Sequence, residues 1–151
     1  MVKKILKGIY YSTIGVISAG ILTISYVSSL GISNELGAKF SNKIRNEQHL
    51  DFLLQKEKSD LGISHKNIEV FMTNDKKGTC WAAKIKNENR YIIHLPKRCH
   101  NINSLKHEVY HIADGHCKEN LTIKSELKRK LKYYLDYEPK AILYATYNIK
   151  F

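Results

Sequence analysis

Apolar and polar positions divide the chain into an uncharged N-terminal stretch and a mixed remainder. Residues 8–33 carry no charge, are rich in Ile, Leu, Val, Tyr, Ser and Gly, and follow a start that contains three lysines. About 20 apolar residues cross the hydrocarbon core of a bilayer as a helix, so this run predicts a membrane anchor within residues 1–34. A signal peptide cleaved near residues 27–29 is the alternative, although the apolar region of such a peptide is typically only about 7 to 15 residues long.

The charges on either side of this run favour one orientation. Three basic residues precede it and three follow by residue 45, but the first group is more tightly clustered, and Glu35 lies just beyond the end of the run. The positive-inside rule therefore predicts a single-pass membrane protein with a cytoplasmic N-terminus, whose residues 35–151 form an external domain.

The remainder of the chain alternates between helical and extended patterns. Apolar residues at near-helical spacing predict a helix over 39–58. Three runs of β-branched and aromatic residues, 68–73, 79–86 and 91–95, are separated by clusters of Asn, Asp and Gly. This arrangement is typical of antiparallel strands joined by hairpins.

Three further helices are predicted after the strands. Asn103 or Ser104 is placed to cap a helix that Gly115 ends. A second helical pattern covers 119–135, and a third opens at Asp136. The sequence thus predicts an α+β domain in which a three-stranded antiparallel sheet packs on helices.

The composition adds a strong positive charge. The chain has 25 Lys and Arg against 14 Asp and Glu, a formal net charge of +11, which can indicate an anionic partner such as nucleic acid. The basic residues, however, recur along the whole chain, and the densest run, 124–132, has leucines four positions apart. Because this spacing is typical of the solvated face of an amphipathic helix, we expect no nucleic-acid partner.

Residues 107–111 read His-Glu-Val-Tyr-His and fit the H-E-x-x-H metal-binding pattern. On a helix, His107 and His111 lie one turn apart, so both imidazoles can reach one metal ion from the same side. Glu108 lies beside the first ligand, where it can take a proton from metal-bound water, whose pKa zinc lowers toward about 7. The motif predicts a Zn²⁺ centre with Glu108 as general base, and two ordinary helix histidines are the alternative.

A third protein ligand is needed, and two positions compete for it. The metzincin pattern would place it at Cys117 and would require glycine at Asp114, so that pattern does not match. His116 is close in sequence, but it follows Gly115 directly and would need a tight chain reversal. Glu138, at the start of the last predicted helix, is the better candidate.

Glu138 and Ala141 form the pattern Glu-x-x-Ala downstream of H-E-x-x-H. Over residues 91–145 the chain resembles gluzincin-type zinc metallopeptidases, in particular the ImmA/IrrE-type and HtpX-like peptidases. The resemblance implies a zincin-like fold, Glu138 as the third zinc ligand, and a small residue at Ala141 that lets two helices approach. Pro139 after the ligand, and Ile142 where Asn or Asp is frequent, depart from that pattern.

The same resemblance implies a zinc-dependent endopeptidase that acts on a protein or peptide substrate at or near a membrane. The substrate backbone would lie along the strand at 79–85 or the one at 91–95. An additional oxyanion donor could come from Tyr144, Tyr147 or His116, which the sequence does not rank. The alternative is a catalytically inactive, zinc-stabilised binding or regulatory module of the same fold, and nothing in the pattern indicates an oligomeric state.

Three cysteines, Cys80, Cys99 and Cys117, show no C-x-x-C spacing and are too few for a disulfide scaffold. A single bridge would favour Cys99 and Cys117, because these two bracket the motif helix. Three buried free thiols are an equally acceptable interpretation.

Overall fold

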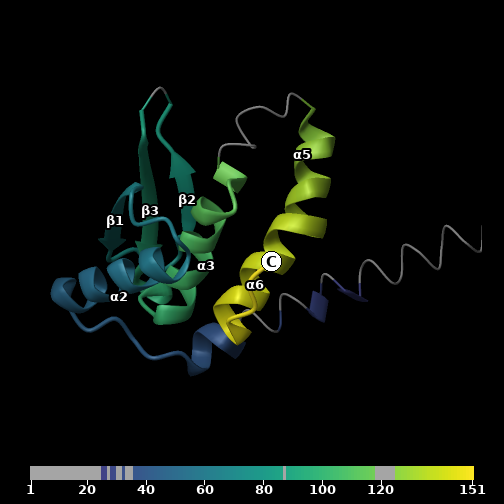
Figure 1. Cartoon of the computed structure of the whole chain (residues 1–151). Coiled ribbons are helices and arrows are strands. Elements are labelled where there is room, and N and C mark those ends of the chain that lie inside the picture. The colour runs from purple at the N-terminus through teal and green to yellow at the C-terminus, as the bar shows by residue number, and fades with distance from the viewer. Residues whose placement is uncertain (1–24, 27, 30–31, 33–35, 87, 118–124) are drawn as a thin grey trace, which may run out of the picture. The chain divides into compact units, whose positions relative to one another are not determined.

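The computed structural model describes residues 25–26, 28–29, 32, 36–86, 88–117 and 125–151. The chain divides into two units, Met1–Ile32 and Ser33–Phe151. The second unit contains all the labelled helices and strands of Figure 1 and is an α+β domain.

A three-stranded sheet forms one side of this domain. Its strands are β1 (Asn67–Thr73), β2 (Trp81–Lys84) and β3 (Arg90–Pro96), in the spatial order β1-β3-β2. β2 and β3 form an antiparallel hairpin, whereas β1 runs parallel to β3. The predicted antiparallel sheet is therefore wrong, and the sheet is mixed.

The physical reason lies in the burial of β3. Its side chains Tyr91, Ile93 and Leu95 are almost completely buried, so this strand takes the central position with a neighbour on each side. β1 and β2 consequently do not pair with each other, although they are consecutive in sequence. The sequence pattern located the three strands but did not encode which strand lies in the middle.

The prediction of a membrane anchor also needs correction. Among the described residues, no helix combines the length and the apolar character that a bilayer crossing requires. The structure therefore does not support the anchor predicted within residues 1–34. It also does not support the predicted single-pass membrane location with an external domain. The seven serines and threonines between residues 12 and 29 dilute the apolar character of this run. Most of the run lies outside the described residues.

Helix α2 (Glu47–Asp60) begins later than the pattern predicted. The Asn46 side chain caps it by accepting a hydrogen bond from the backbone N–H of His49 at 2.8 Å. A separate helical stretch covers 36–40, and Lys43 forms a bridge with Asn101 between the two. Leucines of α2 enter the core through one face, namely Leu50, Leu53 and Leu54.

Helix α3 (Ile102–Ala113) packs between the sheet and the last helix (Figure 1). Its cap is Asn101, which accepts the N–H of Ser104 at 2.9 Å, rather than the predicted Asn103 or Ser104. Gly115 follows the helix with a φ of 81°, a conformation that glycine adopts without strain, so the predicted end is confirmed. The fully buried residues of α3 include Leu105, Val109 and Ile112.

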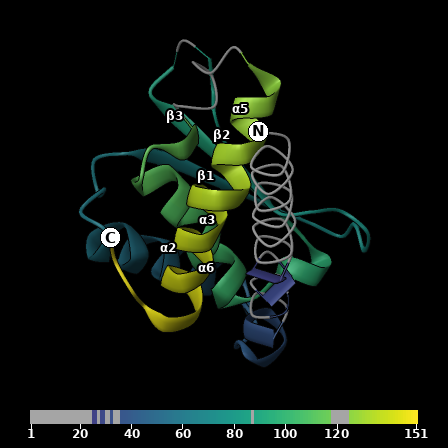
Figure 2. The same cartoon turned by 90° about the vertical axis from the view of Figure 1, so that its right-hand side faces the viewer.

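The C-terminal helices are continuous rather than separate. Helix α5 (Glu126–Lys132) leads through a π-helical turn (Tyr133–Tyr137) directly into α6 (Glu138–Tyr147). Figure 2 shows α6 alongside α3. A helix boundary predicted at Asp136 is thus replaced by a wider turn, and π-helical turns occur frequently at functional sites.

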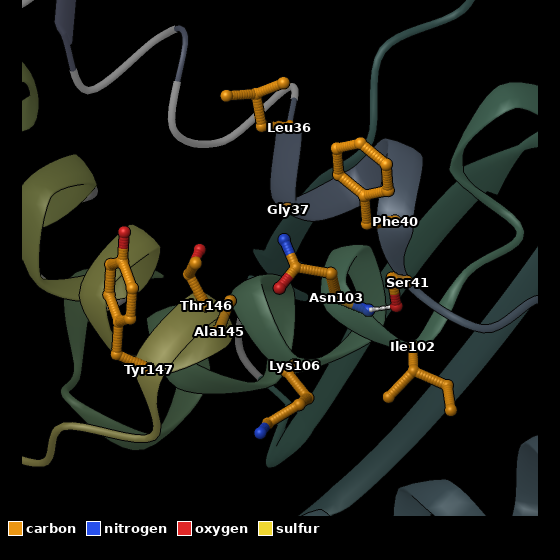
Figure 3. Close-up of a pocket in the computed structure, with 10 residues that line it drawn as sticks. All are labelled: Leu36, Gly37, Phe40, Ser41, Ile102, Asn103, Lys106, Ala145, Thr146 and Tyr147. Atoms are coloured by element: carbon orange, nitrogen blue, oxygen red, sulfur yellow. Dashed lines mark hydrogen bonds between the residues drawn. The ribbon is translucent and has the colours of Figure 1, made fainter.

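The helical stretch 36–40 approaches α3 and α6 closely at Gly37 (Figure 3). A Cβ atom there would lie 3.0 Å from Nδ2 of Asn103 and 3.1 Å from Oγ1 of Thr146. Ser41 accepts a hydrogen bond from the backbone N–H of Asn103 at 2.9 Å. The hydrogen bond ties the end of the segment to α3, and Ala38 and Lys39 line the cleft described below.

Candidate metal centre

Two helices bring three potential metal ligands together. His107 and His111 come from α3, and Glu138 is the first residue of α6. The Nε2 atoms of the two histidines lie 3.1 Å apart. Oε1 of Glu138 lies 3.2 Å from Nε2 of His111, and Oε2 lies 3.5 Å from Nε2 of His107. These residues could hold a metal ion.

The spacing of these atoms fits one ion. In a tetrahedral site with bonds of about 2.0–2.1 Å, neighbouring ligand atoms are separated by about 3.3–3.4 Å. The two Nε2 atoms, 3.1 Å apart, are close to that value, and the Glu138 carboxylate approaches them through Oε1 at 3.2 Å and Oε2 at 3.5 Å. Both histidines are only 6% exposed, so their nitrogen atoms are largely shielded from bulk solvent.

The helix contact that delivers Glu138 depends on a small residue. Ala141, one turn after Glu138, is fully buried against α3 in a cluster with Tyr110 and Tyr144. The two tyrosine rings stack with centroids 5.0 Å apart. A larger side chain at 141 would separate α3 from α6 and move the carboxylate away from the imidazoles.

The three groups alter one another's protonation. Burial opposes the charged form of Glu138, but hydrogen bonds and charge from the two histidines outweigh it and hold its pKa well below the usual value. Burial lowers the pKa of His111. Burial acts in the same direction on His107, but Glu138 and Glu108 together raise its pKa above the usual value. A positive charge among these groups therefore stabilises the cluster, whether it is a proton or a metal ion.

Glu108 lies next to the first ligand and lines the same cleft. Its side chain is buried, and burial raises the pKa of Glu108 to about 7, against the opposing effect of His107. Among the described residues no hydrogen-bond donor engages this carboxylate. The group is therefore available to accept a proton from a molecule in the cleft.

His116 does not belong to the group of three ligands. Its Nδ1 atom lies 2.7 Å from Nδ1 of His111, and its Nε2 atom lies 2.7 Å from Oδ2 of Asp114. The ring also stacks on Tyr137 with centroids 3.8 Å apart. His116 thus orients His111 from the side away from the other ligands. Asp114 contacts His116 and does not contact His111 directly.

Tyr133 is a site residue that the sequence did not indicate. It lines the cleft with His107, Glu108 and Glu138, and its ring stacks on His111 with an interplanar angle of 18°. Burial raises the pKa of Tyr133, and the neighbouring Glu138 raises it further, so the hydroxyl stays protonated. The predicted helix over 119–135 gave no reason to place this side chain near Glu138, because only the π-helical turn brings it there.

The other tyrosines considered as oxyanion donors lie elsewhere. Tyr144 donates its hydroxyl to Oε2 of Glu57 at 2.6 Å, inside the domain. Tyr147 is exposed and lines the separate cavity of Figure 3. Neither lines the cleft that contains Glu108.

The cysteines follow the free-thiol alternative rather than the Cys99–Cys117 bridge. Sγ of Cys80 lies 2.6 Å from Sγ of Cys99, whereas Cys117 donates its thiol to the carbonyl of Ala82. All three thiols are free. Cys80 and Cys99 both line the cleft. The contact between them joins the residue before β2 to the 3-10 turn before α3.

The cleft that these residues surround has a volume of about 540 Å³. The chain matches no family model, no curated protein and no solved structure. Inferences about function therefore rest on the geometry of the cleft and on the chemistry of its side chains.

Proposed function

We propose that this protein is a zinc-dependent endopeptidase. The observation that carries the proposal is the convergence of His107, His111 and Glu138 at a cleft that His107, Glu138 and Glu108 line. Two imidazoles and one carboxylate are a donor set that zinc accepts readily. Structural zinc sites have four protein ligands, whereas three ligands with an open side are typical of catalytic sites.

A bound zinc ion would supply a Lewis acid and a water of lowered pKa. Glu108 would take the proton of that water as it attacks the peptide carbonyl, and would then deliver the proton to the leaving amine. Without a metal the pKa of this buried carboxyl is about 7, and a bound cation would lower it, which favours the carboxylate form that accepts the proton. The low exposure of Glu108 also limits competing contact with bulk water.

Tyr133 supports the proposal as a hydrogen-bond donor. Tyr133 lines the same cleft, and its hydroxyl stays protonated beside Glu138, from where it could donate to an oxygen on which negative charge develops. A donor placed at that position stabilises the transition state more than the substrate.

The sheet offers one edge near the cleft for an extended substrate. β3 is paired on both sides and therefore has no free edge. Of the two strands predicted to bind the substrate backbone, the one at 91–95 is thus excluded. β2 is an edge strand, and Thr79 and Cys80, which directly precede it, line the cleft. A peptide could add to β2 through main-chain hydrogen bonds.

The direct test is cleavage of unstructured protein substrates by the zinc-loaded full-length chain and by its Glu108→Gln variant. We expect the variant to bind zinc and to lose at least about 100-fold in kcat, since it lacks the proton acceptor. Glu126→Gln, which changes an exposed carboxylate on α5, is the matched control and should retain activity. Cleavage by Glu108→Gln at the rate of Glu126→Gln would contradict the role of Glu108. No cleavage by the zinc-loaded wild type would contradict the peptidase proposal and favour the zinc-stabilised binding module.

A further inference from the structure

Two basic side chains reach the cleft from segments that are far apart in the sequence. Lys39, in the helical stretch 36–40, lines the cleft on one side. Arg98 lines it from the short 3-10 turn between β3 and α3. Both residues are exposed, whereas the two acidic residues of the cleft lining, Glu108 and Glu138, are mostly buried. The cations therefore belong to the open part of the cleft and the carboxylates to its floor.

Neither cation is neutralised within the described part of the chain. No carboxylate there lies within ion-pair distance of Lys39 or Arg98. Other basic residues do have such partners: Arg90 contacts Glu69 at 3.1 Å, and Lys140 contacts Asp136 at 2.8 Å. The positive charge at the cleft is thus available to a bound molecule.

The floor of the cleft does not cancel this charge. A zinc ion held by His107, His111 and Glu138 would offset the charges of Glu138 and Glu108, which leaves the two cations as the excess. The net charge of +11 adds a longer-range attraction for anionic segments. An anionic group that enters the cleft is therefore favoured over a cationic one.

Resting on the proposed peptidase function, we infer that the enzyme selects segments with an acidic side chain close to the cleaved bond. Arg98 can engage a carboxylate with two parallel hydrogen bonds, whereas Lys39 provides a single flexible charge. A cleft of about 540 Å³ holds only a few residues, so the acidic residue must lie near the scissile bond. The preferred substrates are acidic stretches of protein in extended conformation.

The test compares three peptide series that differ only in having Asp, Asn or Lys at the positions flanking the cleaved bond. We expect the zinc-loaded wild type to cleave the Asp series with a kcat/KM about tenfold above that of the Lys series. Arg98→Glu and Lys39→Glu should each reduce or reverse this ratio. Lys76→Glu makes the same charge change at an exposed position outside the cleft lining and should leave the ratio unchanged.

A binding measurement separates this inference from the proposed activity. The zinc-loaded Glu108→Gln variant should bind the Asp series more tightly than the Lys series, with a difference that declines as salt is raised. The inference is overturned if cleavage or binding shows no charge preference. It is also overturned if Arg98→Glu and Lys39→Glu leave the kcat/KM ratio of the Asp and Lys series unchanged. Either result would leave the peptidase proposal intact. Preferential binding without cleavage of any peptide would instead contradict the peptidase proposal alone.

Discussion

Nδ1 of His116 lies 2.7 Å from Nδ1 of His111, on the side of the ring opposite the nitrogen that faces His107 and Glu138. The imidazole of His111 is therefore held from both sides. His116 in turn lies 2.7 Å from Asp114, just beyond the end of α3. The contact with His116 supports His111, whereas neither Nδ1 of His107 nor Nε2 of His116 has a hydrogen-bond partner among the described residues. One ligand is therefore oriented from behind and the other, His107, is not.

His116→Ala should weaken metal binding without abolishing it. Loss of an outer partner of a ligand typically reduces metal affinity about 10- to 100-fold, because the ring is no longer held in its binding orientation. Competition with a chromophoric chelator measures the change. His65→Ala, at an exposed position, is the control and should bind metal like the wild type. An affinity for His116→Ala equal to that of the control would contradict the supporting role.

Tyr133→Phe should lower kcat while metal content and KM stay nearly constant. The substitution removes a donor that acts on developing charge, and loss of such a donor typically costs about 100- to 1,000-fold in kcat. Tyr134→Phe changes the adjacent, exposed tyrosine and is the matched control. A fall in zinc content for Tyr133→Phe would show that the hydroxyl supports Glu138 rather than the reaction.

Tyr144→Phe should destabilise the domain. Its hydroxyl donates to Glu57, whose side chain is buried, so the substitution removes a partner from a buried carboxylate. We expect the free energy of unfolding to fall by about 1–3 kcal/mol in denaturant titrations. In the background of Glu57→Gln, the same change should cost less. A cost that is identical in both backgrounds would show that the contact contributes no coupling energy.

Removal of the metal should lower the thermal stability of the wild type. The ion would link α3 to α6, and at a free concentration 100 times its Kd it adds about 2.7 kcal/mol to the free energy of unfolding. A chelator should therefore lower Tm, and added zinc should restore it. His111→Ala should not respond to either treatment. A wild-type Tm that is insensitive to chelator and zinc would contradict the presence of a metal between these helices.

The local chemistry of the site was readable from the sequence, but its surroundings were not. The five residues 107–111 predicted a helix with both imidazoles on one side, because helical spacing alone determines that geometry. The prediction that Glu138 accompanies them came from a resemblance, and the structure brings its carboxylate within 3.5 Å of both nitrogen atoms.

The features that were missed depend on contacts distant in sequence. The central position of β3 follows from how three strands share one core, which no single strand encodes. The π-helical turn that places Tyr133 at the cleft forms where α5 and α6 join, although Pro139 and Asp136 suggested a new helix start. The anchor was predicted from the length of an uncharged run, whereas no helix among the described residues has the length and apolar character of a membrane span.

The most direct measurement of the central claim is the zinc stoichiometry of the full-length protein and three variants, determined by elemental analysis after dialysis. Wild type and Glu108→Gln should each retain about one zinc ion per chain, whereas His111→Ala and Glu138→Ala should lose most of it. A wild type that retains no zinc, or a Glu138→Ala variant that retains as much as the wild type, would contradict the three-ligand metal centre.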